Sequence, residues 1–162
     1  MTATKINTEK VNPASRQDDA MAPSTAPGFI NLDLEIKADI DLTPLADHLT
    51  GKAFILFNGR TDTGYRLEME PLIAGALSGD AHQCTKHFLT ILNTLPAGLK
   101  ALWEAATSRL FDFGFDSGQE STPLITTLPC SLLLQIANLG ADIRITLYPC
   151  SDADVEEMED LE

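Results

Sequence analysis

The sequence is poor in basic residues. Its 162 residues include 11 lysines and arginines against 24 aspartates and glutamates, a net charge of −13 at pH 7. Nucleic acids and anionic membrane surfaces repel a protein of this charge, so neither is expected as a primary partner. Hydrophobic residues make up 44% of the chain, which is enough to bury a core and excludes a wholly disordered protein.

Cysteine is also scarce: the chain has Cys84, Cys130 and Cys150. An odd number without CxxC spacing does not predict a disulfide framework. A Cys130–Cys150 bridge is left as an alternative that a reducing compartment disfavours. No apolar run approaches the roughly 18 residues of a membrane span, and residues 1–27 lack the apolar segment of a secretory signal. We therefore expect a cytoplasmic protein without a membrane partner.

The distribution of charge divides the chain into three predicted segments. Residues 1–27 balance their charges and contain three prolines, which predicts a flexible polar leader. Residues 28–150 are predicted to form a single domain. Residues 151–162 contain seven acidic residues and no basic one. This acidic C-terminal tail either serves only solubility or reaches a basic partner.

Hydrophobic periodicity within the domain predicts both strands and helices. Alternating residues or short apolar runs predict strands at residues 30–37, 54–57, 65–69, 109–116 and 143–148. Apolar residues at three- and four-residue spacing predict helices at residues 43–49, 80–95, 96–106 and 128–139. We therefore predict an α+β fold, with an antiparallel or mixed sheet of about five strands and helices packed on one face. A ferredoxin-like (split βαβ) arrangement matches this order.

Capping and turn residues set the predicted boundaries. Thr43 is predicted to cap the first helix, with Pro44 at its first position. Asp80 is predicted to cap the second helix. Asn58, Gly59 and residues 62–64 predict a hairpin with a longer loop.

The closing third of the chain resembles one bacterial family. Its pattern is Phe-Asp-Phe-Gly-Phe-Asp-Ser-Gly at residues 111–118, Leu-Leu at 132–133, Ile-Ala-Asn-Leu-Gly-Ala at 136–141, and a strand ending in Tyr148. This succession is similar to the bacterial domain of unknown function 4279 family, over residues 29–149. The chain departs from the family over residues 50–69, which are shorter and lack its tryptophan strand. The resemblance supplies no catalytic residue and implies a small bacterial immunity or interaction protein.

Two motifs suggest catalytic or ligand chemistry, and each has a simpler explanation. Gly59 and Gly64 have the spacing of a phosphate-binding loop, but Tyr65 and Arg66 occupy the positions of its Lys and Ser or Thr. A hairpin turn therefore explains these glycines. Cys84 and His87 share a predicted helix face, yet a zinc site needs about four ligands. Packing of Cys84 is favoured over metal binding or a catalytic Cys–His pair.

Two further patterns are also assigned to structure. Phe111, Phe113 and Phe115 could stack nucleic-acid bases, but their aspartate neighbours favour core packing instead. Residues 152–156 resemble the opening of a calcium loop, but Glu157 stands where its glycine is required. We expect neither a metal nor a cofactor.

Acidic residues remain as the candidate site. Asp112 and Asp116 share a strand face, with Glu120 in the next loop. A carboxylate pair performs acid–base chemistry only where the environment separates the two pKa values. The alternatives are a solvated face or an acidic binding ridge.

Charge and the lack of a catalytic constellation predict a non-enzymatic acidic protein-binding domain. The family resemblance adds that it is an immunity-type protein, which binds and neutralises a cognate, basic bacterial toxin. The residues expected to steer this partner are Asp112, Asp116, Glu120, Asp152, Asp154, Glu156 and Glu157. One alternative is a self-associating scaffold or adaptor, a homodimer formed through an exposed strand edge. A small-molecule-binding enzyme is the other.

Overall fold

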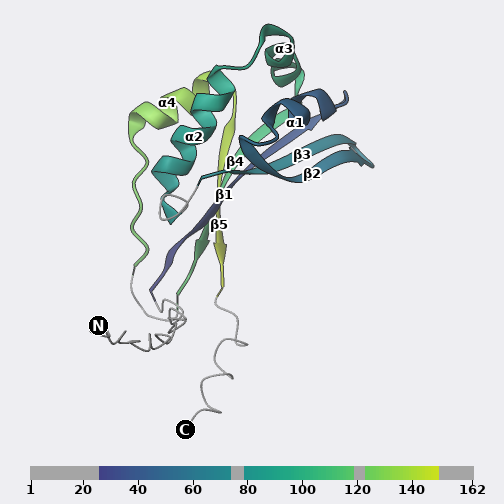
Figure 1. Ribbon diagram of the computed structural model, residues 1–162. Coiled ribbons are helices and arrows are strands. Elements are labelled where there is room, and N and C mark those ends of the chain that lie inside the picture. Colours follow the sequence, from purple (N-terminus) through teal and green to yellow (C-terminus); the bar gives the residue numbers. More distant parts are fainter. Residues whose placement is uncertain (1–25, 74–78, 119–122, 150–162) are drawn as a thin grey trace, which may run out of the picture.

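A computed structural model of the protein describes residues 26–73, 79–118 and 123–149 (Figure 1). Most of the predicted leader, Glu120, Cys150 and the acidic tail lie outside the described residues. The elements in order are β1 (Gly28–Ala38), α1 (Thr43–Leu49), β2 (Ala53–Thr61), β3 (Gly64–Pro71), α2 (Ala81–Asn93), α3 (Ala97–Ala105), β4 (Ser108–Asp116), α4 (Cys130–Asn138) and β5 (Asp142–Tyr148). The predicted α+β class and the predicted succession of elements are confirmed.

The strands form one mixed sheet in the order β2-β3-β1-β4-β5. Neighbouring strands are antiparallel except for β4 and β5, which are parallel. A parallel pair needs a long crossover connection, and α4 lies within that connection. The longest strand, β1, occupies the centre of the sheet.

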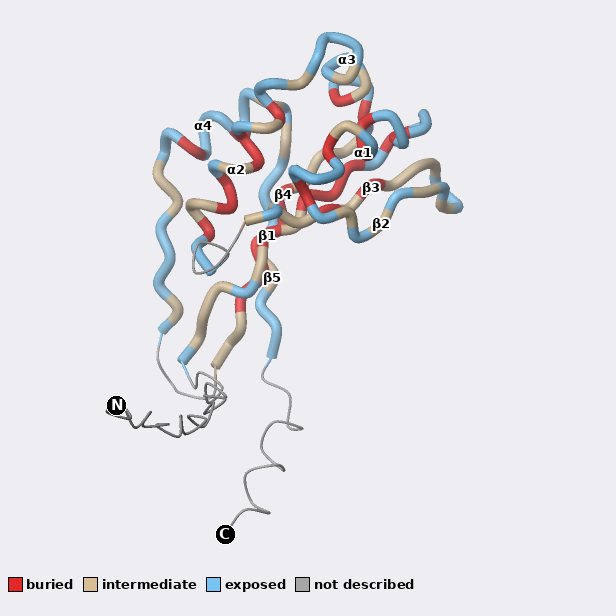
Figure 2. Tube along the Cα trace, in the orientation of Figure 1, coloured by how far each residue is buried: buried red, intermediate tan, exposed pale blue. Residues whose placement is uncertain are grey.

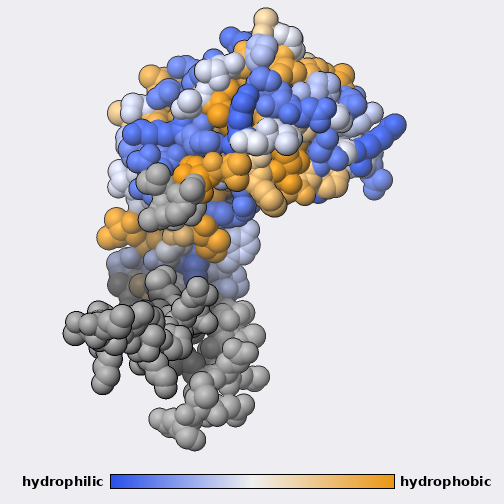
Figure 3. Space-filling view, viewed as in Figure 1, coloured by the Kyte–Doolittle hydropathy of each residue, from blue (hydrophilic) through white to orange (hydrophobic). Residues whose placement is uncertain are grey.

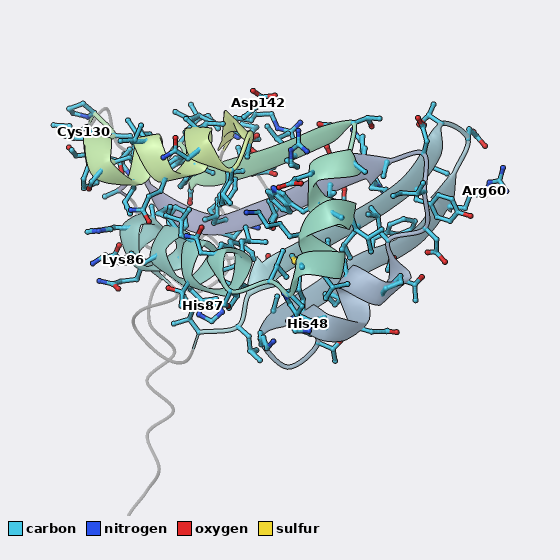
Figure 4. All side chains as sticks on the ribbon, turned by 90° about the horizontal axis from the view of Figure 1, so that it is seen from above. His48, Arg60, Lys86, His87, Cys130 and Asp142 are labelled. Carbon is cyan, nitrogen blue, oxygen red and sulfur yellow. The ribbon has the colours of Figure 1, made fainter. Side chains whose placement is uncertain are left out.

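The helices cover one face of this sheet. Seen from above, all four lie in front of the strands (Figure 4). The buried residues lie where the two layers meet (Figure 2). The strands contribute to this core Leu32, Leu34 and Ile36 of β1, Leu67 and Met69 of β3, and Phe111, Phe113 and Phe115 of β4. The predicted core role of the three phenylalanines is confirmed. Among the described residues, no helix combines the length and hydrophobicity needed to cross a membrane.

Two predicted local features are wrong. The side chain of Asp41, rather than Thr43, accepts hydrogen bonds at the start of α1, from the Thr43 backbone N–H at 2.9 Å and hydroxyl at 2.7 Å. The hairpin loop is also short, because Asn58 and Gly59 lie inside β2 and only residues 62 and 63 separate the strands. Gly64 has φ +125°, and a Cβ there would lie 2.6 Å from the Ala38 carbonyl oxygen, so this tight turn requires glycine.

Phe113 provides a test of the core. It is 1% exposed and is paired with Leu32 of β1. Phe113→Ala is expected to lower the free energy of unfolding by about 3–5 kcal/mol, through lost burial and the cavity that remains. Urea denaturation measures this change. Ile125→Ala, at an 83% exposed position, is the control and should stay within about 0.5 kcal/mol of wild type. Equal losses in the two variants would contradict the packing described here.

Candidate functional site

The sheet face opposite the helices carries most of the charged residues of the sheet, beside Phe54 and Phe57 of β2, and no helix among the described residues covers it. Alternation along each strand sends to this face the residues that are not packed in the core. Strand pairing then places these residues beside one another. The charged side chains on this open face are Asp33, Glu35 and Lys37 of β1, Arg66, Glu68 and Glu70 of β3, Asp112 and Asp116 of β4, and Asp142 and Arg144 of β5.

Three carboxylates form one row across the open face. Asp33 is paired with Asp112 of β4. On the other side of β1, Glu70 directly follows Met69, which pairs with Leu34. We call Glu70, Asp33 and Asp112 the acidic row. Like charges directly opposite one another destabilise a sheet, so this arrangement has an energetic cost.

At one end of the row, β5 neutralises Asp112. The parallel register sets Arg144 beside Asp112, and Arg144 donates to Asp112 Oδ2 from Nε at 2.8 Å and Nη2 at 2.6 Å. The Thr146 hydroxyl donates to Oδ1 at 2.7 Å. Burial alone would raise the pKa of Asp112, but these hydrogen bonds and the Arg144 charge hold it below its usual value. Both carboxylate oxygens of Asp112 are therefore already engaged within the protein.

The centre of the row has only a neutral partner. Asn31 Nδ2 donates to Asp33 Oδ1 at 3.2 Å and to Glu70 Oε1 at 3.0 Å. Within the described ranges, neither Asp33 nor Glu70 makes an ion pair. Burial, followed by the charges of Glu70, Asp112 and Glu68, raises the pKa of Asp33 to about 6. Asp33 and Glu70 are therefore neighbouring negative charges on the open face that share only a neutral partner.

Gly114 makes room for the bridging amide. It is paired with Asn31, and a Cβ at Gly114 would collide with Asn31 Oδ1. A ring atom of Tyr148 lies 3.3 Å from the same position. The glycine between two core phenylalanines thus helps to hold Asn31 against the acidic row.

A second pair of acids beside the row is compensated internally. Glu35 and Glu68 are paired across β1 and β3. Lys37 Nζ lies 2.9 Å from Glu35 Oε1, and Arg66 Nη1 lies 3.2 Å from Glu68 Oε1. The Arg66 guanidinium also stacks 4.5 Å from the centroid of the Phe57 ring. These charges surround the acidic row without adding net charge.

Of the site residues predicted from sequence, only Asp112 lies in the acidic row. Asp116 is at the far end of β4, where its Oδ1 accepts a 2.7 Å hydrogen bond from Gly118 N in the following turn. Glu120 and the tail residues Asp152, Asp154, Glu156 and Glu157 lie outside the described residues. Asp33 and Glu70 are not among the site residues predicted from sequence, although the alternating pattern of their strands predicts that both face solvent.

The residues considered for catalysis are not arranged for it. Cys84 is buried, and burial, with Asp80 and then Glu70, raises the pKa of its thiol to about 11, whereas a nucleophilic cysteine needs a thiolate. His87 lies on α2 (Figure 4) and donates from Nε2 to the Lys52 carbonyl at 2.6 Å. In the part of the chain that the structure describes, no group of three His, Cys, Asp or Glu residues could hold a metal ion. The cavity beside Glu70 holds about 80 Å³, well below the roughly 300–1,000 Å³ of ligand pockets.

Comparison with family models, with curated proteins and with solved structures finds no match to this chain. The chemistry of the open face therefore carries the functional argument. That face offers fixed carboxylates on a rigid sheet, with no ligand-sized pocket beside Glu70.

Asp33→Asn is expected to stabilise the protein at neutral pH. The Asp33 pKa of about 6 exceeds the ordinary value of 3.8, so the folded state binds this proton more tightly than the unfolded state. Stability from this group is therefore present at low pH and is lost as pH rises toward 6 and above. Removing the charge should raise the free energy of unfolding at pH 7 by about 1 kcal/mol, a value reduced for solvent screening at this half-buried position.

Urea denaturation from about pH 4 to about pH 7 measures the free energy of unfolding of the wild type and of Asp33→Asn. In the Asp33→Asn variant, the free energy of unfolding should fall less with rising pH, because the contribution of Asp33 is absent. Asp47→Asn, at an exposed position of α1, removes the same charge outside the acidic row and is the matched control. A loss of stability at pH 7 in Asp33→Asn would show that the acidic row is not under repulsion.

Proposed function

We propose that this protein is a non-enzymatic binding domain whose open sheet face binds a basic protein. The observation that carries the proposal is the pair Asp33 and Glu70, fixed carboxylates on an uncovered face with only the Asn31 amide between them. Burial and then repulsion from Glu70 and Asp112 raise the pKa of Asp33, and a guanidinium or ammonium group placed between Asp33 and Glu70 would relieve that repulsion. It would also form ion pairs with both carboxylates, which adds a charge attraction that the neutral Asn31 amide lacks.

The shape of the surface favours a macromolecule over a small ligand. The acidic row lies across a sheet whose strands are fixed by the core beneath, so its carboxylates lose little freedom on binding. The net charge of −13 would steer a basic partner toward this face, and electrostatic steering raises association rates from about 10⁵–10⁶ to as much as about 10⁸–10⁹ M⁻¹s⁻¹. Salt should weaken such a complex.

The specific partner we propose is a basic bacterial toxin, with this protein acting as its immunity protein. Occlusion of the toxin's functional surface by the sheet face would neutralise it. The acidic charge supports a basic partner, and the resemblance to the bacterial domain of unknown function 4279 family supports an immunity role. We expect this protein to be located in the cytoplasm.

We also propose that the fold is a ferredoxin-like (split βαβ) unit extended by one strand. β3 lies between β1 and β2 and is antiparallel to both. In the same way, β1 lies between β3 and β4 and is antiparallel to both. Each helical connection thus joins two parallel strands with one strand inserted, as in the split arrangement. In this description α4 and β5 are an addition at the β4 edge, and the open face is the surface of the unit without helices.

Capture from a lysate of the protein's own host, followed by mass spectrometry, tests the proposed surface. Tagged wild type should retain one basic partner in stoichiometric amount at low salt and lose it at high salt. Glu70→Lys reverses the charge in the acidic row and should reduce capture at least tenfold. Asp47→Lys makes the same change in net charge on α1, at an exposed position, and should capture as well as wild type. Equal loss in both variants would contradict a specific surface and indicate a response to net charge alone.

Co-expression tests the neutralising role. The captured partner, expressed alone, should arrest growth, and wild type should restore growth while Glu70→Lys should not. Asp47→Lys is again the matched control and should protect. A partner that is harmless when expressed alone would contradict the immunity role while leaving the binding surface intact.

A further inference from the structure

The edge strand β5 exposes an apolar row on the helix side of the sheet. Ile143, Ile145 and Leu147 are paired with Phe111, Phe113 and Phe115 of β4, which places all six side chains on the same face. The phenylalanines are at most 2% exposed, but Ile143, Ile145 and Leu147 are 39%, 65% and 58% exposed. The helices thus cover β4 and leave β5 uncovered, as the exposure along β5 shows (Figure 2).

The position of α4 explains this exposure. Its buried residues are Leu132 and Ile136, and the helix packs against α2. It ends beside Asp142, where β5 begins (Figure 4). Further hydrophobic surface is visible on the segment that leads into α4 (Figure 3). Over the described residues, the apolar row of β5 has no helix above it and no strand along its outer edge.

This edge has few of the features that block pairing with another strand. Protective features include prolines, bulges and charged side chains directed along the edge. The opposite edge strand, β2, has a register shift between Ile55 and Phe57 and carries Arg60 near its end. β5 has no register shift against β4 and no internal proline, and its Arg144 is held by Asp112.

The residue pattern of β5 is complementary to itself. If two copies lie antiparallel with their Ile145 residues opposite each other, Ile143 faces Leu147 and Arg144 faces Thr146. Apolar residues then meet apolar residues on the helix side, and polar residues meet polar residues on the open face. The strand carries one acidic and one basic residue, Asp142 and Arg144, so a second copy meets no net charge there. A basic partner would instead be attracted to the acidic row.

We propose that β5 is a homodimer interface, in which two copies of the chain join their β5 strands antiparallel about a two-fold axis at Ile145. The two sheets then form one continuous sheet. Because the axis is perpendicular to the sheet, both helix layers lie on one side and both acidic rows on the other. This interface is independent of the partner proposed above.

Analytical ultracentrifugation of the full chain tests the proposal. Wild type should sediment as a dimer that dissociates on dilution, and salt should strengthen the dimer because it screens the −13 charge of each copy. Ile145→Lys places like charges opposite one another at the axis and should weaken association at least tenfold. Phe54→Lys makes the same type of change on β2, at a residue of similar exposure (58%), and should leave the dimer intact. Circular dichroism melting should confirm that both variants remain folded.

Disulfide trapping tests the register. In a Cys130→Ser, Cys150→Ser background, Ile145→Cys should form a cross-linked dimer on mild oxidation. Residues directly opposite in an antiparallel pair have Cα atoms about 4.5–5.5 Å apart, which is within disulfide range. Phe54→Cys in the same background should not cross-link.

Three results would overturn the proposal. The first is that the wild type stays monomeric at all concentrations. A lower melting temperature of the Ile145→Lys variant would then indicate that another segment of the chain covers β5. The second is a dimer that Ile145→Lys does not weaken. The third is the absence of a cross-link at position 145.

Discussion

Alternation of apolar and polar residues in β1, β3 and β4 is the constraint on which the rest of the structure depends. A side-chain period of two divides each strand between the two faces of the sheet. Because the helices bury Leu34, Phe111 and their apolar neighbours, the charged residues must share the opposite face. A slip of one residue would expose the phenylalanines and bury Asp33. The acidic row is therefore held in place by the core and cannot relieve its repulsion by moving a strand.

The electrostatic cost of the acidic row is greater at Asp33 than at Asp112, and the order of the strands explains the difference. Asp112 lies next to β5, where Arg144 and Thr146 engage both of its oxygens. Asp33 lies on the central strand between two acidic neighbours and is held only by an amide, so burial and then these neighbours raise its pKa. Arg144 and Thr146 instead hold the pKa of Asp112 below its usual value in spite of burial. Natural sequences keep such local conflicts mainly where function requires them. For the proposed binding of a basic protein, this asymmetry favours Asp33 and Glu70 over Asp112 as the centre of the surface.

The sequence analysis succeeded where the signal is local. Periodicity identified each strand and helix in order, and the alternating Phe111, Phe113 and Phe115 indicated the core correctly. It could not find the acidic row, because Asp33, Glu70 and Asp112 come from distant parts of the chain and meet only through strand pairing. Acidic residues that lie close together in sequence, such as those of the C-terminal tail, give a stronger signal and are therefore predicted as the site instead. The hairpin is shorter than predicted because Gly59, a residue type common in turns, lies within β2.

The α4–β5 extension has two opposing effects. By adding a strand beside β4, it supplies the guanidinium that makes a buried carboxylate at Asp112 tolerable. Without Arg144, the Oδ2 atom of Asp112 would lose both of its hydrogen bonds, at a cost of roughly 1–3 kcal/mol. The same strand ends the sheet with an apolar edge that α4 does not cover. A symmetric pairing of β5 would bury that edge and leave the acidic rows of both copies on one side of the dimer. The proposed self-association and the proposed binding of a basic protein would therefore use different surfaces, and salt should strengthen the first while it weakens the second.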